Sequence, residues 1–174
     1  MKRRWVSFSQ TGLVLVLLVF SLIASGCTLN AFGQAEEEPA LALPTPSPAL
    51  SPEEVVHLQL ESLQHNDETN KGIEAAFNFA SPGNKRSTGP LTRFVKMLKA
   101  PPYNAMLNHK SVQFDPIEIS GDSATQRVKL ISADGQSTVY IFMLSKQTEA
   151  PYQDCWMTDG VVVEPTRDLP QDQA

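Results

Sequence analysis

Hydrophobic residues recur at helical spacing in the stretch that follows residue 50. Val56, Leu60 and Leu63 fall on one face of a helix running from about residue 52 to 65, whereas polar residues take the other face. The preceding Ser51-Pro52-Glu53-Glu54 offers an N-cap serine, a proline suited to the first turn and the glutamate of a capping box. The pattern therefore predicts an amphipathic helix with a clearly marked start.

The same spacing predicts two further helices before residue 100. One follows Gly72, runs to about residue 80 and is expected to stop at Ser81-Pro82-Gly83-Asn84. The other spans residues 89–99 and is expected to stop at Pro101-Pro102. A short helical turn is predicted over residues 103–107.

From residue 111 onward the hydrophobic period changes to two, which is typical of strands. Pro116 marks the first strand as an edge strand or a bulge, and Asp134-Gly135 is the strongest hairpin signal in the chain. The third strand is apolar on both faces, so we expect it at the centre of the sheet or covered on both sides. The predicted strands are residues 111–114, 124–132, 137–145 and 156–163.

Helices followed by an antiparallel meander are typical of α+β folds. We expect the N-terminal helices to pack on the concave face of a curved, four-stranded antiparallel sheet. The interior of such a cone is either filled by side chains or open to a ligand, and the sequence leaves both alternatives open.

The first 27 residues have the pattern of an export signal. Three cations at positions 2–4 precede an apolar run of 12 residues, Leu13–Ala24, which is about 18 Å long as a helix and too short for a bilayer core of about 30 Å. The following Ile23-Ala24-Ser25-Gly26-Cys27 resembles the bacterial lipobox, whose cysteine receives a diacylglyceryl group and becomes the new N-terminus. The alternative is an ordinary signal peptide cleaved near Ala24 or Gly26, which leaves Cys27 a free thiol.

These patterns predict four segments. Residues 1–26 are a lipoprotein signal peptide, and residues 27–50, rich in Pro and Glu, are a lipid-anchored disordered tether. Residues 51–164 are the α+β domain and residues 165–174 a flexible tail. The predicted location is the outer side of the cytoplasmic membrane, facing the periplasm or the extracellular space.

Composition narrows the classes of function. The chain has 174 residues and a net charge of −5, and removing residues 1–26 takes away three cations and no anion, so bulk charge argues against nucleic-acid binding. The two cysteines cannot make a disulfide framework, and we expect Cys155 to be buried. No glycine-rich phosphate loop or dinucleotide fingerprint is present, so we expect no cofactor.

The predicted domain also carries a set of recognisable motifs. They are Ser51–Val56, Phe79–Asn84, Thr88–Leu91 with Phe94, Met106–His109 and Cys155–Val161. Together they resemble a family catalogued as a domain of unknown function, DUF4864, which occurs in bacteria, including cyanobacteria, and in plants. The resemblance spans about residues 51–163 and implies a fold similar to the NTF2-like cone, without an established activity.

Folds of this cone shape often hold a carboxylate or histidine at the bottom of a pocket as a general base. Asp159 is the candidate base here, with Trp156 and Tyr140 as candidate pocket walls. The alternative for Asp159, which precedes a glycine, is a turn or bulge. His109 is a further candidate pocket residue, and its alternative is capping of backbone groups at the junction between helices and sheet.

Charge is unevenly distributed along the domain. Residues 71–110 contain seven cations and only Glu74 as an anion, a local charge of +6. Arg93, Lys96 and Lys99 are expected to project from the predicted third helix away from its apolar stripe. This surface is a candidate site for anionic lipid headgroups or an acidic protein partner, and the alternative is an ordinary solvated face.

His57 lies between Glu53 and Glu61 at four-residue spacing on the first helix, a candidate metal site whose alternative is a polar, solvated face. Because the histidines lack zinc-ligand spacing, we expect no bound metal. The sequence thus favours a membrane-anchored lipoprotein with a non-catalytic ligand- or partner-binding domain. The alternative is an isomerase- or hydratase-type enzyme that uses Asp159 as its general base.

Overall fold

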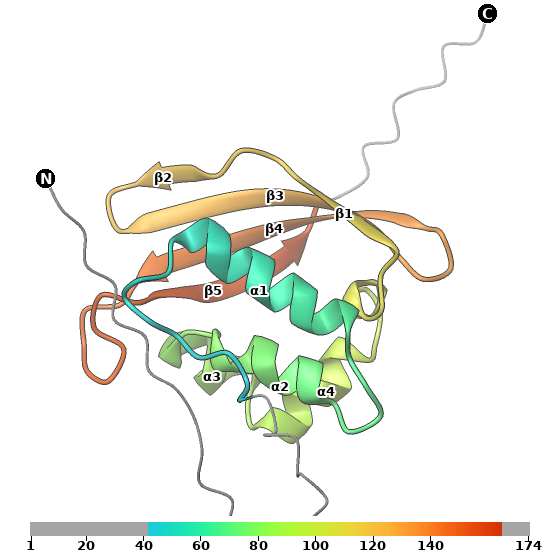
Figure 1. Cartoon of the computed structure of the whole chain (residues 1–174), viewed down its shortest axis with the longest axis horizontal. Helices are drawn as coiled ribbons and strands as arrows, with labels where there is room; N and C mark the ends of the chain where they lie inside the picture. The colour runs from blue at the N-terminus through green and yellow to red at the C-terminus, as the bar shows by residue number, and fades with distance from the viewer. Residues whose placement is uncertain (1–41, 165–174) are drawn as a thin grey trace, which may run out of the picture. The chain divides into compact units, whose positions relative to one another are not determined.

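The computed structural model describes residues 42–164 of the chain. Helices come first and strands follow, so the predicted α+β class is confirmed (Figure 1). The helices are α1 (Pro52–Gln64), α2 (Lys71–Asn78), α3 (Pro82–Thr88) and α4 (Leu91–Leu98), followed by the 3-10 turn η1 (Tyr103–Met106). The strands are β1 (Ser111–Phe114), β2 (Glu118–Ser120), β3 (Ser123–Ile131), β4 (Ser137–Lys146) and β5 (Trp156–Val163).

All strand pairs are antiparallel, and the order across the sheet is β1-β3-β4-β5. The fifth strand, β2, pairs with the same edge of β3 as β1 does. The prediction of four strands was therefore wrong by one. Pro116 separates β1 from β2 and lies at the sheet edge, as its missing N–H requires, so one interrupted edge forms two short strands.

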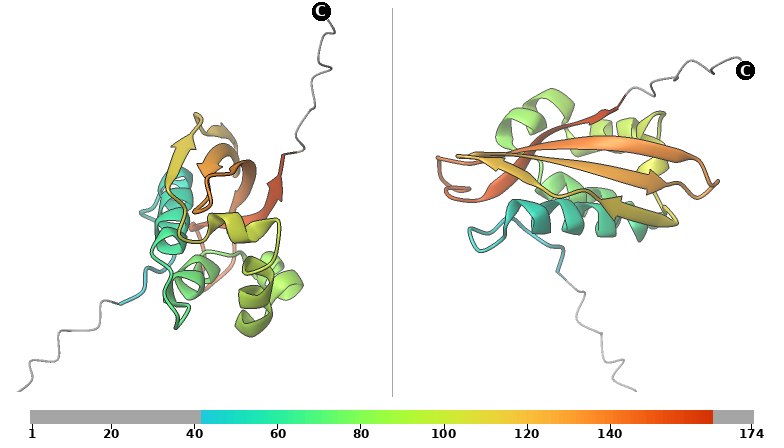
Figure 2. Two further views of the ribbon diagram at one scale, coloured as in Figure 1. Left: turned by 90° about the vertical axis from the view of Figure 1, so that its right-hand side faces the viewer. Right: turned by 90° about the horizontal axis from the view of Figure 1, so that it is seen from above.

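The helices lie on one side of a curved, open sheet (Figures 1 and 2). On the side that faces them, β4 buries Tyr140, Phe142 and Leu144, each at most 2% exposed. On its other side Val139 and Ile141 are half-buried and Met143 is 38% exposed. The central position predicted for this strand is confirmed, whereas in the described part of the chain helices cover only one of its two faces.

The hydrophobic core fills the space between the helices and the sheet. Its residues come from α1, α2, α4, η1 and strands β3 to β5, and include the fully buried Val56, Leu60, Ile73, Val128 and Leu130. Residues 42–164 form one compact unit by themselves. Because this unit contains its whole core, we expect it to fold without the residues that precede it.

Two helices begin with the same Ser-Pro signal. Ser51 Oγ accepts a hydrogen bond from Glu54 N (3.2 Å), and Glu54 Oε2 accepts one from Ser51 N (2.7 Å), so the predicted capping box is confirmed. Ser81 Oγ likewise accepts from Asn84 N (3.2 Å) at the start of α3. The sequence interpretation of residues 81–84 as a helix stop missed this second start, because α3 buries no residue and thus shows no apolar period.

Gly72 permits the close packing of α2 against α1. A Cβ atom at this position would lie 2.1 Å from the carbonyl oxygen of Ser62, closer than any real contact. Only glycine fits there, so the residue that looked like a boundary in the sequence lies inside α2 and sets its distance from α1.

The described part of the chain begins ten residues before α1. Asn78 Nδ2 donates a hydrogen bond to the Pro44 carbonyl (3.2 Å), and Leu50 packs against the core. The end of the segment predicted as a tether thus lies against the domain. Between residues 42 and 164, no helix has the length and apolar character needed to cross a bilayer.

Candidate functional site

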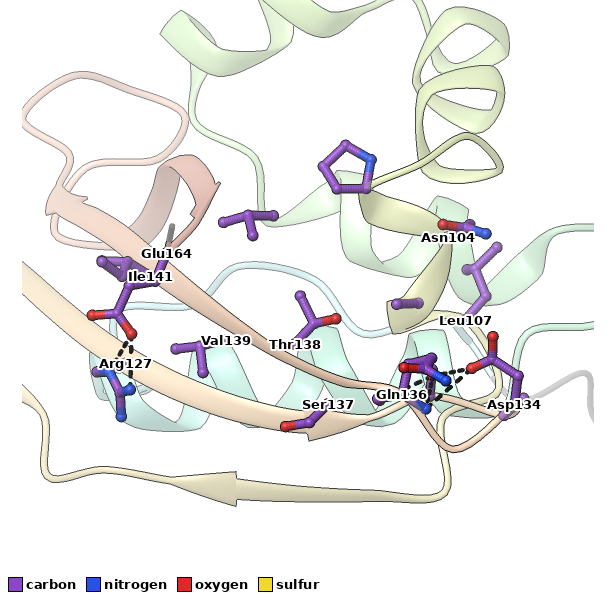
Figure 3. Close-up of a pocket in the computed structure, with 15 residues that line it drawn as sticks. Asn104, Leu107, Arg127, Asp134, Gln136, Ser137, Thr138, Val139, Ile141 and Glu164 are labelled. Atoms are coloured by element: carbon purple, nitrogen blue, oxygen red, sulfur yellow. Dashed lines mark hydrogen bonds and ion pairs between the residues drawn. The ribbon is translucent and has the colours of Figure 1, made fainter. Parts of the chain in front are cut away.

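A groove of about 1330 Å³ lies beside the N-terminal half of β4, near the end of β5 (Figure 3). Its lining comes from η1 and the residues directly beside it, from the loop between β3 and β4, from the N-terminal half of β4 and from the C-terminal end of β5. Val139 and Ile141 supply apolar surface on the outer face of the sheet, whereas Val163, opposite Tyr140, and Leu107 supply it on the helix-facing side, so the lining passes around the edge of β4. The other lining residues are Pro102, Asn104, Ala105, Arg127, Ser132, Ala133, Asp134, Gln136, Ser137, Thr138 and Glu164.

Backbone groups of β4 are also exposed along this groove. β5 ends at Val163, opposite Tyr140, and the N–H of Glu164 donates to the Val139 carbonyl (2.9 Å). Backbone groups of an antiparallel strand point alternately to its two neighbours, so the N–H and C=O of Ser137 point the same way as those of Val139. Among residues 42–164, β5 supplies no partner opposite Ser137. Within residues 42–164, the N–H and C=O of Ser137 therefore face the groove without a strand partner.

Arg127 joins two strands across one wall of the groove. Its Nε and Nη2 donate to Glu164 Oε2 (2.9 and 2.8 Å), and its Nη1 donates to Asp115 Oδ2 (2.8 Å). These bonds, to Glu164 first and Asp115 second, raise the pKa of the guanidinium. Because the paired side chains are 37–44% exposed, water screens the ion pairs, and they contribute little to stability. Their main effect is to neutralise one another's charge.

Asp134 stands at the opposite end of the groove in the hairpin loop. Its carboxylate accepts hydrogen bonds from the Ser132 hydroxyl and from the Gln136 N–H (3.3 Å). These two bonds, and more weakly the charge of Lys110, lower the pKa of Asp134. Gly135, at φ +92°, takes the left-handed conformation that this turn requires. The hairpin predicted at Asp134-Gly135 is confirmed, and the Asp134 carboxylate makes its hydrogen bonds within the turn.

A second, smaller cavity of about 210 Å³ lies between the helices and β5. The buried aromatic side chains of Tyr140 and Phe142 fill much of the space beneath the sheet. Phe77 and Phe94 pack against each other with ring centroids 4.8 Å apart and planes tilted by 44°. This cavity is smaller than the roughly 300 Å³ at which typical ligand pockets begin. The interior of the domain is therefore mostly filled, with a small remaining space lined by Phe94 and Phe142.

Asp159 lines this smaller cavity but is itself exposed. The register of β5 shifts here: Thr158 faces Leu144 and Gly160 faces Met143, so Asp159 is the extra residue of a β-bulge. Thr158, directly before it, is buried and donates from its hydroxyl to Gln59 Oε1 (2.6 Å), and Gln59 Nε2 donates to the Ala76 carbonyl (3.0 Å). These two buried side chains bond to the protein itself.

The other predicted pocket residues lie elsewhere. Tyr140 is fully buried, and its hydroxyl donates to the Pro102 carbonyl (2.7 Å); burial raises its pKa to about 12. Trp156 belongs to the hydrophobic core. His109 is 3% exposed, and its Nδ1 lies 3.0 Å from the Met106 carbonyl. None of the three lines either cavity, so the structure does not bring them together with Asp159.

His57 stacks on Phe114 of β1, with ring centroids 3.7 Å apart and planes 13° apart. It also lines a shallow hollow of about 350 Å³ with Glu53 and Glu61. Within residues 42–164, no group of three or more His, Cys, Asp or Glu side chains has the geometry of a metal site. The histidine therefore connects α1 to the edge of the sheet.

Three of the predicted surface residues are placed as expected. Arg93, Lys96 and Lys99 are exposed at α4, whose Phe94 and Leu98 are buried. Cys155 is buried, as predicted, and burial raises the pKa of its thiol. Cys27, the predicted lipidation site, lies outside the described residues.

Sequence reasoning missed the groove altogether. Arg127 lies within β3, Asp115 directly follows β1 and Glu164 directly follows β5, so the two carboxylates are 12 and 37 residues from Arg127 along the chain. No local motif marks them, because their proximity depends on the register of β3 with its neighbours.

The family model described as "Domain of unknown function (DUF4864)" matches residues 49–170. This chain therefore belongs to the DUF4864 family, as its motifs predicted. No curated protein and no solved structure is significantly similar to it. The relation to NTF2-like cones remains a prediction.

Proposed function

We propose that this member of the DUF4864 family is a lipid-anchored, non-catalytic binding protein that holds a segment of a partner protein in the groove beside β4. The observation that carries the proposal is the backbone edge of β4 at Ser137, which has no strand partner within residues 42–164. An extended polypeptide can add to such an edge through main-chain hydrogen bonds, while pockets beside the edge receive alternate side chains. Val139 and Ile141 offer an apolar surface for those side chains.

The size of the groove favours a polypeptide over a small molecule. Its volume of about 1330 Å³ exceeds the range of roughly 300–1,000 Å³ that is typical of small-ligand pockets. Its polar groups, among them Asn104, Gln136 and Ser137, are spread along the lining and do not converge on one point (Figure 3). This arrangement suits a long ligand whose hydrogen-bonding groups recur at regular intervals, as they do in an extended polypeptide.

The chemistry of the lining favours binding over catalysis. The groove contains no histidine, cysteine or lysine. Arg127 and Glu164 neutralise each other, and the lowered pKa of Asp134 takes that carboxylate away from the neutral range in which a general base works best. For the alternative enzyme, Asp159 is exposed beside a cavity of only about 210 Å³, so no observation favours the hypothesis of an isomerase or hydratase.

The anchor is proposed from the sequence. The three cations, the short apolar run and the small residues before Cys27 support cleavage and lipidation. Each buried methylene of an acyl chain contributes about 0.8 kcal/mol to membrane binding, so a cysteine with several chains holds the protein durably. The domain would then act on the outer side of the cytoplasmic membrane.

Lipidation is tested by expressing the whole chain in bacteria supplied with labelled palmitate. The wild type is expected to take up label and to sediment with membranes, whereas Cys27→Ser loses both properties. Cys155→Ser is the matched control, because it removes a buried thiol that has no part in anchoring. Label and membrane retention that persist in Cys27→Ser would disprove the anchor.

Binding in the groove is tested by native mass spectrometry of the protein extracted gently from its own membrane. A companion polypeptide is expected on the wild type and on Thr125→Asp, a control on the exposed face of β3. Val139→Asp places a charge on the apolar surface of the groove and is expected to release the companion. A companion retained equally by all three proteins, or absent from the wild type, would contradict the proposed site.

A further inference from the structure

Four cations form an exposed surface on two adjacent helices, which we call the α3–α4 basic face. Its members are Arg86, Arg93, Lys96 and Lys99. Helices α3 and α4 contact each other, and residues 82–100 contain no Asp or Glu. Along α4 the cations recur every three residues, whereas Phe94 and Leu98 point into the core. The positive charges therefore share the outward side of α4.

Nothing in the described residues neutralises these charges. The ion pairs within residues 42–164 both belong to Arg127, on the sheet. Lys85, the fifth cation of this stretch, is engaged differently: its Nζ donates to the Asn78 carbonyl (2.9 Å) and lies 5.1 Å from the ring centre of Tyr152. Lys85 thus belongs to the packing of α3, and the four members of the basic face are left with their full charge toward solvent.

The charge of the helical layer is polarised. Helix α1 contains Glu53, Glu54 and Glu61 and no Lys or Arg. Helix α2 contacts both α1 and α4, so the acidic helix and the basic face lie on opposite sides of the layer (Figure 2, left). A negatively charged surface would therefore attract the α3–α4 basic face and repel α1, which orients the domain relative to that surface.

We infer that the α3–α4 basic face binds the anionic headgroups of the membrane to which the protein is anchored. The choice of a membrane as the binding partner rests on the proposed lipid anchor. Only 14 residues separate Cys27 from the first described residue, a reach of at most about 50 Å. At this range a lipid surface is always present, whereas an acidic protein would have to be recruited. The groove would then be presented at a defined angle to the bilayer.

The test uses residues 42–174, which retain the compact unit with its core and lack Cys27. Sedimentation is measured with vesicles of phosphatidylcholine alone and with an equal mixture of phosphatidylcholine and phosphatidylglycerol. Each cation near an anionic surface contributes about a fivefold factor to binding. Replacing Arg93, Lys96 and Lys99 by Gln is therefore expected to weaken binding to the anionic vesicles on the order of a hundredfold.

The matched control replaces Lys110, Lys129 and Lys146 by Gln, which removes the same charge from the other part of the domain. It is expected to weaken binding less than about fivefold, the contribution of one cation at the surface. Circular dichroism of both variants establishes that they fold. Equal losses in the two variants, or binding that ignores phosphatidylglycerol, would overturn the inference.

Binding of the fragment to soluble polyglutamate but not to anionic vesicles would also overturn it, in favour of an acidic protein partner. Because the fragment has no lipidation site, its behaviour is independent of the palmitate experiment. A failure of the anchor and a failure of the basic face are thus distinguishable.

Discussion

The two faces of β4 have nearly the same hydrophobicity and opposite environments. Tyr140, Phe142 and Leu144 on one face are at most 2% exposed, whereas Met143 on the other face is 38% exposed and Ile141 is half-buried. The helices cover only the first face (Figure 1). The difference shows that an apolar pattern marks surface that is available for burial, and that the layer packed against it decides whether burial occurs.

The polar groups differ between the two sides in the same way. Between the helices and the sheet, Thr158 donates to Gln59 Oε1, and Gln59 Nε2 donates to the Ala76 carbonyl. At the open end of the sheet, the backbone of Ser137 lies along the groove without a partner in β5. The Thr158–Gln59 pair is thus satisfied within the protein, although Gln126 Oε1 on the same side of the sheet is buried without a partner in the described part of the chain. The backbone of Ser137 faces the groove, where a ligand can reach it.

The strongest test of this contrast replaces one residue on each face. Phe142→Ala leaves a cavity in the core and is expected to lower the free energy of unfolding by about 3–5 kcal/mol. Ile141→Ala removes a half-buried side chain that lines the groove, so its cost is expected to be about 1 kcal/mol. Urea denaturation measures both, and equal costs would show that the outer face is as tightly packed as the inner one.

A smaller effect is expected from the buried polar pair. Thr158→Val keeps the shape of the side chain but removes the donor to Gln59 Oε1, so an unsatisfied acceptor remains in the interior. The expected loss is about 1–3 kcal/mol in the free energy of unfolding. Thr125→Val, on the exposed face of β3, is the control and should change stability by less than about 0.5 kcal/mol. Similar losses of unfolding free energy in the two variants would show that the buried hydrogen bond does not stabilise the fold.

The smallest effect concerns the hairpin at the groove. The pKa of Asp134 is lowered in the folded state, so its stabilising effect is present above the unfolded pKa of about 3.9 and is lost as pH falls through the folded value. The urea midpoint of the wild type should therefore exceed that of Asp134→Asn at neutral pH, and the gap should close in more acidic solution. A gap that is unchanged by acid would mean that the carboxylate charge does not stabilise the turn.

Local signals predicted the elements that depend on near neighbours. The capping box at Ser51, the hairpin at Asp134-Gly135 and the edge position of Pro116 all follow from groups within a few residues of one another. Helix α3 was missed because its start signal was taken for a stop and no apolar period followed. The family was recognised from short motifs, which is again local information.

The candidate site depended on distant residues. Asp159 was chosen for its chemistry, but the bulge in β5 leaves it exposed, and Tyr140 and Trp156 lie in the core. No sequence pattern marked Arg127 and Glu164 as candidate site residues, because neither belongs to a motif. Their pairing requires β3, β4 and β5 to align in one register.

By itself, the sequence determined the α+β class, the family, the buried cysteine and the outward cations of α4, because each follows from residue type and short spacing. Only the tertiary structure decided which face of β4 the helices cover, where β5 ends relative to β4, and how large a groove remains there. Those properties depend on where separate elements meet, and they arise only when the sheet and the helical layer pack together.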